Sequence, residues 1–169
     1  MKSFRLWLYR CCASCLPETR FWGLKSQLLR WAGACIGDNV RICSSVKIYG
    51  SGNLIIGNDV WIGHETQIST GIGGDVNICD AVDISDRVII STGSHEIDFF
   101  GCRSAGIGTQ KSIVIKEGAW LGMGVIILQG VNVGRKCVVG AGAVVTRDLD
   151  ECCVCVGVPA RRARCFSKA

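Results

Sequence analysis

The chain has 169 residues, of which 49% are hydrophobic, and a formal net charge of +5. This length can bury one hydrophobic core but not two, so we expect one β-rich unit with short appendages. No run of about 18 or more apolar residues occurs, which excludes a transmembrane helix. The positive charge gathers near the two ends while the middle is close to neutral, and this distribution argues against a nucleic-acid-binding surface.

Residues 1–35 differ from the rest, because tryptophan, leucine and phenylalanine alternate there with lysine and arginine. Pro17-Glu18 divides the segment, and proline breaks a helix interior, so we predict two short amphipathic helices. We expect these helices to cap the end of the domain that follows and to shield its strand edges. Aromatic and basic side chains together are also typical of helices that lie on a membrane surface, so peripheral membrane contact is a second expectation.

An aliphatic residue recurs with a six-residue spacing through residues 36–150, with short interruptions. The repeated positions are Ile36, Ile42, Ile48, Ile56, Ile62, Ile68, Ile78, Ile84, Ile90, Ile115, Leu121, Ile127, Val133, Val139 and Val145. Six is a multiple of the two-residue strand repeat, so these side chains share one face of extended strands. Three such hexads form one triangular coil, and the pattern predicts a solenoid of stacked coils, the parallel β-helix.

We therefore divide the chain into a helical cap (1–35), a β-helix (36–150) with a loop at 91–114, and a C-terminal tail (151–169). A β-sandwich with accidental spacing is the alternative interpretation. Sandwich strands recur about every 8–12 residues with wider scatter in phase, and this favours the β-helix.

The twelve cysteines are interpreted as free thiols in a reducing compartment, the cytoplasm. Three of them occupy β-helix positions that suit a small apolar residue: Cys43, Cys79 and Cys137. Two clusters lack the two-plus-two ligand spacing of a zinc site: Cys11, Cys12, Cys15 and Cys152, Cys153, Cys155. We therefore expect neither structural disulfides nor a bound metal.

The six-residue spacing is lost between Ile90 and Ile115, where we expect the solenoid to extrude a polar loop that forms the binding face. His95 follows the last regular strand and is flanked by Glu96 and Asp98. Imidazole accepts a proton near neutral pH, and a neighbouring carboxylate can fix its tautomer and raise its basicity. His95 is thus a candidate general base, the alternative being a loop histidine that only forms a hydrogen bond.

Four stretches resemble one known family. They are Thr92-Gly93-Ser94-His95-Glu96-Ile97, Gly118-Ala119-Trp120-Leu121-Gly122, Gly140-Ala141-Gly142-Ala143-Val144-Val145-Thr146-Arg147-Asp148 and Gly157-Val158-Pro159-Ala160-Arg161. With the repeats they cover about residues 30–165, and together they are similar to the hexapeptide-repeat acyltransferases. The Ser-His-Glu-Ile start and the Arg-Ser-Ala-Gly-x-Gly loop are most similar to the branch that acetylates sugars of surface polysaccharides. The resemblance implies a left-handed β-helix, a homotrimer and the use of acetyl-CoA.

The resemblance also implies roles for particular residues. His95 matches the general base, which deprotonates the acceptor during direct attack on the acetyl-CoA thioester, without an acyl-enzyme. The positions implied to bind acetyl-CoA are Trp120, Gly122, Ala141, Gly142, Thr146, Arg147, Arg161 and Arg164. Candidate acceptor contacts in the loop are Glu96, Asp98 and Arg103. Trp120 as a plug for one coil, and the arginines as a solvated tail, are the alternatives.

Two positions qualify the resemblance. Met123 stands where relatives often have serine or alanine, so stabilisation of the oxyanion would fall to a backbone N–H, and a longer acyl group than acetyl stays an alternative. His64 is the only other histidine, and we expect a surface or interface residue. Two histidines do not provide the three-histidine zinc site of carbonic anhydrases with the same fold, which argues against a metal hydratase.

The resulting prediction is an acetyl-CoA-dependent O-acetyltransferase that acts on a sugar hydroxyl of a surface polysaccharide or its precursor. We expect a cytoplasmic homotrimer, at the inner face of the membrane if residues 1–35 make peripheral contact, with active sites between subunits. N-acetylation of an amino-sugar nucleotide or a small antibiotic-like acceptor is the alternative reaction. A non-catalytic β-helix scaffold is the alternative from another class.

Overall fold

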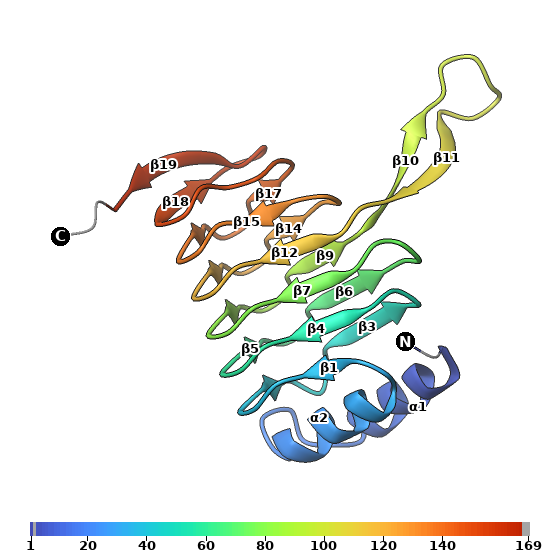
Figure 1. Ribbon diagram of the computed structural model, residues 1–169, viewed down its shortest axis with the longest axis vertical. Helices are drawn as coiled ribbons and strands as arrows, with labels where there is room; N and C mark the ends of the chain where they lie inside the picture. The colour runs from blue at the N-terminus through green and yellow to red at the C-terminus, as the bar shows by residue number, and fades with distance from the viewer. Residues whose placement is uncertain (2, 167–169) are drawn as a thin grey trace.

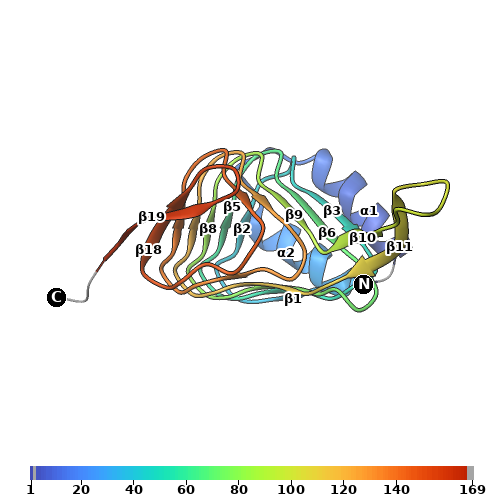
Figure 2. The same cartoon turned by 90° about the horizontal axis from the view of Figure 1, so that it is seen from above.

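The computed structural model describes residues 1 and 3–166, in which two helices precede a left-handed parallel β-helix (Figure 1). The predicted fold class is therefore confirmed. Each coil contributes one strand to each of three parallel sheets, so the column is triangular when seen along its axis (Figure 2).

The three sheets are named here A, B and C. Sheet A contains β1 (Cys35–Ile36), β4 (Leu54–Ile56), β7 (Val76–Ile78), β12 (Ile113–Ile115) and β15 (Asn132–Val133). Sheet B contains β2 (Arg41–Ile42), β5 (Trp61–Ile62), β8 (Asp83–Ile84), β13 (Trp120–Leu121), β16 (Val138–Val139), β18 (Cys153–Val156) and β19 (Arg161–Cys165). Sheet C contains β3 (Lys47–Gly50), β6 (Gln67–Thr70), β9 (Ile89–Ser91), β14 (Ile126–Ile127) and β17 (Val144–Val145).

The six-residue spacing places the repeated aliphatic residues in register inside the column. In sheet B, Ile42 aligns with Ile62, Ile62 with Ile84, Ile84 with Leu121 and Leu121 with Val139. All five side chains are 0% exposed. Burial of one such side chain stabilises the fold by about 1.5–3 kcal/mol, so the stacked columns provide most of the driving force for folding.

The corners of the column need backbone that turns through the left-handed region. At the corner between sheets B and C, called here the BC corner, positive φ occurs at Glu65, Arg87, Gly124 and Gly142. Glycine has no Cβ and adopts this conformation without strain. At Gly122 the requirement is close packing, because a Cβ there would lie 2.7 Å from the backbone nitrogen of Ala141 in the next coil.

Helices α1 (Ser3–Ser14) and α2 (Trp22–Trp31) contact β1, β2 and β3 and so cover the first coil of the solenoid. Leu6, Tyr9 and Leu29 are buried on the inner faces of the helices. Lys25 is also fully buried, and its Nζ donates to Pro17 O, Glu18 O and Ser44 Oγ. Among the described residues, neither helix has the length and apolar character needed to span a membrane.

Between β9 and β12 the chain leaves the column at the corner between sheets C and A, called here the CA corner. It forms an antiparallel hairpin of β10 (Gly93–Ile97) and β11 (Ala105–Gln110) that projects outward (Figures 1 and 2). The expectation of a polar loop was wrong in one respect. The tip is apolar, and Phe99 and Phe100 are 81% and 101% exposed.

At the other end, β18 extends sheet B and β19 pairs with it in antiparallel orientation. A disulfide joins Cys153 of β18 to Cys165 of β19, so the expectation that every cysteine is free was wrong for this pair. Adjacent antiparallel strands place these two positions opposite each other, a pairing that sequence spacing did not show. Cys43 and Cys137 are buried, and Cys79 is half-buried, as expected for residues that replace small hydrophobes.

We expect ten of the twelve cysteines to react with a thiol reagent in denaturant without reductant, because Cys153 and Cys165 are paired with each other. Reduction before the assay should raise the count to twelve. Twelve reactive thiols in the unreduced protein would contradict the disulfide.

Ile90→Ala should lower the free energy of unfolding by about 2–5 kcal/mol, because the 0% exposed side chain of Ile90 leaves a cavity in the column. Urea unfolding at one fixed protein concentration measures the change. Ile72→Ala is the control, since Ile72 is 83% exposed and its loss should cost less than about 0.5 kcal/mol. Equal losses in both variants would show that the column does not govern stability.

Candidate active site

His95 lies on β10 of the projecting hairpin, opposite Gly108 of β11, and its side chain is exposed. Its Nδ1 is 2.9 Å from the carbonyl oxygen of Gly106. A carbonyl only accepts hydrogen bonds, so Nδ1 carries the proton in this contact and Nε2 of the neutral ring keeps its lone pair. The hairpin thus holds the imidazole in the tautomer that a general base needs.

The flanking carboxylates do not orient His95, contrary to expectation. The ring partner of His95 is the Gly106 carbonyl, and the strand pairing is irregular between His95 and Ile97, where Glu96 lies. Asp98 instead accepts hydrogen bonds from the backbone N–H of Phe100 and Gly101, at 2.9 and 2.8 Å. These two bonds hold the pKa of the Asp98 carboxyl below its usual value. Gly106, which sequence analysis did not single out, supplies the orienting group because the hairpin register brings its carbonyl to the ring.

The base of the hairpin is fixed to the column. Thr92 is 0% exposed, and its Oγ1 donates to Gln110 Oε1 at 3.0 Å. On the next coil Gln129 bonds Thr109 Oγ1 through Nε2 at 3.0 Å. The hairpin that carries His95 therefore rises from a rigid support.

Two of the three candidate acceptor contacts line a shallow depression of about 280 Å³ on the hairpin. Glu96 and Asp98 share it with the apolar side chains of Phe99, Phe100 and Ile107. Arg103 is exposed but is not among its lining residues. The depression combines carboxylate and aromatic groups, which are the groups that bind hydroxyls and the faces of sugar rings.

The candidate donor residues of β13 lie on sheet B and at the BC corner. Trp120 is 52% exposed, so it does not plug a coil, and its Nε1 donates to Ser85 Oγ at 3.3 Å. Gly122 precedes Met123 at the BC corner, and the N–H of Gly142 in the next coil donates to Met123 O at 2.8 Å. Gly122 and Gly142 thus form a strip of backbone without side chains, called here the ledge, beside the exposed indole of Trp120. Ser85, which the sequence did not single out, holds that indole in position.

The remaining donor candidates divide between two places. Thr146 and Arg147 are exposed at the CA corner, on the same edge of the column as the hairpin. Arg161 and Arg164 are exposed on β19 at the end of sheet B. Arg161 donates to the carbonyl of Ala160, and Arg164 stacks on Phe166, so neither guanidinium is neutralised by a carboxylate among the described residues.

One chain alone does not bring the predicted base and donor residues together. The hairpin with His95 projects from the CA corner, whereas Trp120 lies on sheet B. Figure 2 shows the sheet B strands β2, β5 and β8 on the side of the column away from the hairpin. His95 and the donor candidates Trp120 and Gly122 therefore lie on different faces, whereas Thr146 and Arg147 share the edge from which the hairpin projects.

Comparison with known proteins is consistent with this architecture. The profile of the family "Bacterial transferase hexapeptide (six repeats)" matches residues 112–147. The "Putative colanic acid biosynthesis acetyltransferase WcaF" of Escherichia coli (strain K12) is 37% identical over 79% of this chain and 70% of its own length. The "Putative acetyltransferase C18B11.09c" of Schizosaccharomyces pombe is 40% identical over 53% of this chain, but the match spans only 42% of that protein.

Solved structures show the same fold. A point mutant of AntD, an N-acyltransferase from Bacillus cereus, in complex with dTDP and coenzyme A, has a TM-score of 0.71 and 22% identity, covering 90% of this chain and 92% of its own. A hexapeptide-repeat acetyltransferase from Vibrio cholerae O1 biovar eltor, in complex with acetyl coenzyme A, has a TM-score of 0.63 and 24% identity, covering 98% and 87%.

The β-helix, its interrupting hairpin and these relatives define an acyltransferase. The chain belongs to the hexapeptide-repeat acetyltransferase family.

Asp98→Ala should accelerate hydrogen exchange of the Phe100 and Gly101 amides several-fold, because both lose their acceptor. Exchange measured by NMR checks this, and Asp98→Asn is the matched control because it keeps an acceptor oxygen. In the wild type, protection of both amides should persist above the usual Asp pKa and fall only as pH drops through the lowered one. Unchanged exchange in Asp98→Ala would show that the Asp98 carboxylate does not hold these two amides.

Proposed function

We propose that the protein transfers the acetyl group of acetyl-CoA to a sugar hydroxyl of a surface polysaccharide or its precursor, with His95 as the general base. The observation that carries this proposal is the contact between His95 Nδ1 and Gly106 O, which leaves Nε2 free to accept a proton. WcaF, named for colanic acid biosynthesis, supports a glycan acceptor.

The reaction is a direct transfer. Nε2 of His95 takes the proton of the acceptor hydroxyl as its oxygen attacks the thioester carbonyl carbon. The C–S bond then breaks, and the imidazolium returns the proton to the departing CoA sulfur. General-base assistance of this kind contributes about 10²–10⁴ in rate, and positioning of the two substrates and a backbone N–H near the oxyanion supply the rest.

The active site lies between subunits of a homotrimer. Within one chain His95 and Trp120 stand on different faces, so a neighbouring copy must bring a CA-corner hairpin against a BC corner. Trp120, Gly122, Ala141 and Gly142 line the pantetheine arm there. Thr146 and the guanidinium groups of Arg147, Arg161 and Arg164 meet the nucleotide end, where guanidinium suits phosphates.

The acceptor binds in the depression beside His95. Glu96 and Asp98 accept hydrogen bonds from sugar hydroxyls there, Arg103 approaches from the rim, and the exposed phenyl rings cover an apolar sugar face. N-acylation of an amino-sugar nucleotide is the second candidate, favoured by the fold shared with AntD, whose structure contains dTDP. Met123 is 53% exposed on the donor side, where it limits or shapes the acyl pocket.

The protein works in the cytoplasm, with residues 1–35 in contact with the inner face of the membrane. Phe4 and Trp7 are 70% and 50% exposed on α1, and residues 1–17 contain no acidic side chain. Such a helix favours an anionic lipid surface.

His95→Ala should lower kcat by at least about a hundredfold, because the acceptor loses its general base. His95→Asn is the matched variant, since its amide nitrogen can still bond Gly106 O but cannot accept a proton. Release of CoA thiol, measured with monosaccharides, nucleotide sugars and lipid-linked glycans, gives the rate. Mass spectrometry of the product separates O- from N-transfer.

Near-normal turnover in a folded His95→Asn protein would overturn the role of His95. Binding of the donor is checked separately by thermal denaturation, since a ligand of the native state raises Tm. A Tm that excess acetyl-CoA does not move would favour a non-catalytic scaffold instead.

A further inference from the structure

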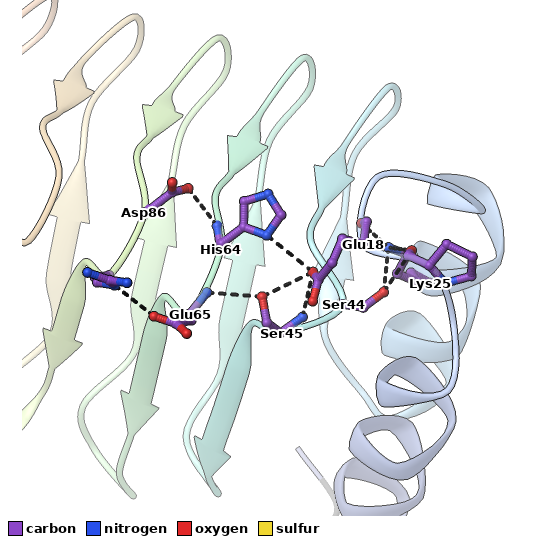
Figure 3. Close-up of polar contacts among 9 residues, drawn as sticks. Glu18, Lys25, Ser44, Ser45, His64, Glu65 and Asp86 are labelled. Atoms are coloured by element: carbon purple, nitrogen blue, oxygen red, sulfur yellow. Dashed lines mark hydrogen bonds and ion pairs between the residues drawn. The ribbon is translucent and has the colours of Figure 1, made fainter.

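Three side chains that commonly bind metals converge where the helical cap meets the solenoid. Glu18 comes from the loop between α1 and α2, Cys43 directly follows β2, and His64 follows β5 one coil further along. One carboxylate oxygen, Sγ and one ring nitrogen all lie within 4.8 Å of one another. Figure 3 shows Glu18 and His64 pointing toward each other across this seam.

Neighbouring groups hold the two exposed members in place. Glu18 Oε2 accepts hydrogen bonds from Ser45 N and Ser45 Oγ, each at 3.0 Å (Figure 3). The backbone N–H of His64 donates to Asp86 Oδ1 at 2.8 Å. The Ser45 bonds act on the Glu18 carboxylate itself and fix the direction of this ligand, whereas the Asp86 bond fixes the backbone that carries His64.

The third member is a buried thiol with no role in the acyl-transfer site. Cys43 is a free cysteine that is 1% exposed, at the first coil of sheet B. The hydrogen-bonding groups nearby bond elsewhere, because Lys25 Nζ donates to Pro17 O, Glu18 O and Ser44 Oγ. Glu18, Lys25 and Asp86 are the charged groups that act on the Cys43 thiol, and Glu18 and His64 are the metal-binding side chains within 4.8 Å of it.

We propose that Glu18, Cys43 and His64 bind one Zn²⁺, with water in the fourth tetrahedral position. Mixed sulfur, nitrogen and oxygen ligands suit zinc, whereas the thiolate disfavours Mg²⁺ and Ca²⁺. Tetrahedral zinc bond lengths place ligand atoms roughly 3.3–3.7 Å apart. Glu18 Oε2 and His64 Nδ1 are already 3.4 Å apart, and Cys43 Sγ, within 4.8 Å of its two partners, closes the remaining distance when the metal binds.

Zinc binding changes the net charge of the three-residue cluster by one unit. Burial raises the pKa of the Cys43 thiol to about 11, so this group holds its proton in the metal-free protein. Zn²⁺ displaces that proton to water as the Zn–S bond forms, while Glu18 binds as carboxylate and His64 as neutral imidazole. Zn²⁺ enters and one proton leaves, so the three ligands and the metal together are neutral, whereas the metal-free cluster carries the single negative charge of Glu18.

Bound zinc would join the helical cap to the first two coils of the β-helix. The three ligands belong to the interhelical loop and to the first two coils, which also meet through the hydrogen bond from Ser44 Oγ to Pro17 O and the Glu18 contacts with Ser45 and His64. A ligand that binds only the native state stabilises it in proportion to its affinity and concentration. Zinc would therefore hold the cap onto the open end of the β-helix.

The test uses the full chain, with Zn²⁺ and Co²⁺ as probes after reduction and removal of metal. We expect one Zn²⁺ per chain by calorimetry and elemental analysis, and a thiolate-to-cobalt charge-transfer band with Co²⁺. His64→Gln and Glu18→Gln should weaken zinc binding at least tenfold, and Cys43→Ser should also abolish the band. Cys137→Ser is the matched control, because Cys137 is equally buried near the other end of sheet B.

The exposed cysteines at the C-terminal end of α1 and directly after it need their own control. A protein with Cys11, Cys12 and Cys15 all changed to Ser should bind zinc as the wild type does. Loss of binding in that protein, or unchanged binding in His64→Gln, would overturn the proposal. A wild type that binds no zinc would also overturn it and would leave Glu18 and His64 as an ion pair only. Every readout is independent of acetyl transfer, so the outcome does not depend on the proposed reaction.

Discussion

The stacking of buried aliphatic side chains in register, coil upon coil, is the constraint on which the rest of the structure depends. Each inward residue contacts its equivalents above and below, and the parallel strands that carry them are hydrogen-bonded between coils. Among the described residues the interior of the column is almost entirely apolar, and the buried hydroxyl of Thr66 is satisfied by the carbonyl of Ser85. Chemistry is therefore confined to the corners, the outer faces and the segments that leave the column.

The hairpin at the CA corner is one of the segments that leave the column, and it carries the candidate base. Its two strands hold His95 away from the column, while the base of the hairpin is tied down through Thr92. The imidazole is thus both exposed and oriented, two properties that rarely coincide in a mobile loop. Sheet B offers the complementary features on another face, an exposed indole at Trp120 beside a ledge where Gly122 permits close packing of coils.

The helical cap covers the open end of the solenoid. The first coil would otherwise present unpaired strands and an open apolar interior, and α1 and α2 cover it. The cap is joined to the column by polar contacts as well as by packing, with Lys25 buried beneath α2 and Glu18 bonded to Ser45. The seam between cap and column is consequently the most polar part of an otherwise apolar interior.

The sequence by itself determined the solenoid, its coil length, the two helices and the place where the column is interrupted, because these features follow from local periodicity and from proline. It also singled out His95 and Trp120 through motifs that are contiguous in the chain. It did not predict the carbonyl of Gly106 as the partner of His95, the Cys153–Cys165 disulfide, or the meeting of Glu18, Cys43 and His64. Hairpin register and coil stacking decide these contacts, since they join residues whose separation along the chain carries no signal of their proximity in space.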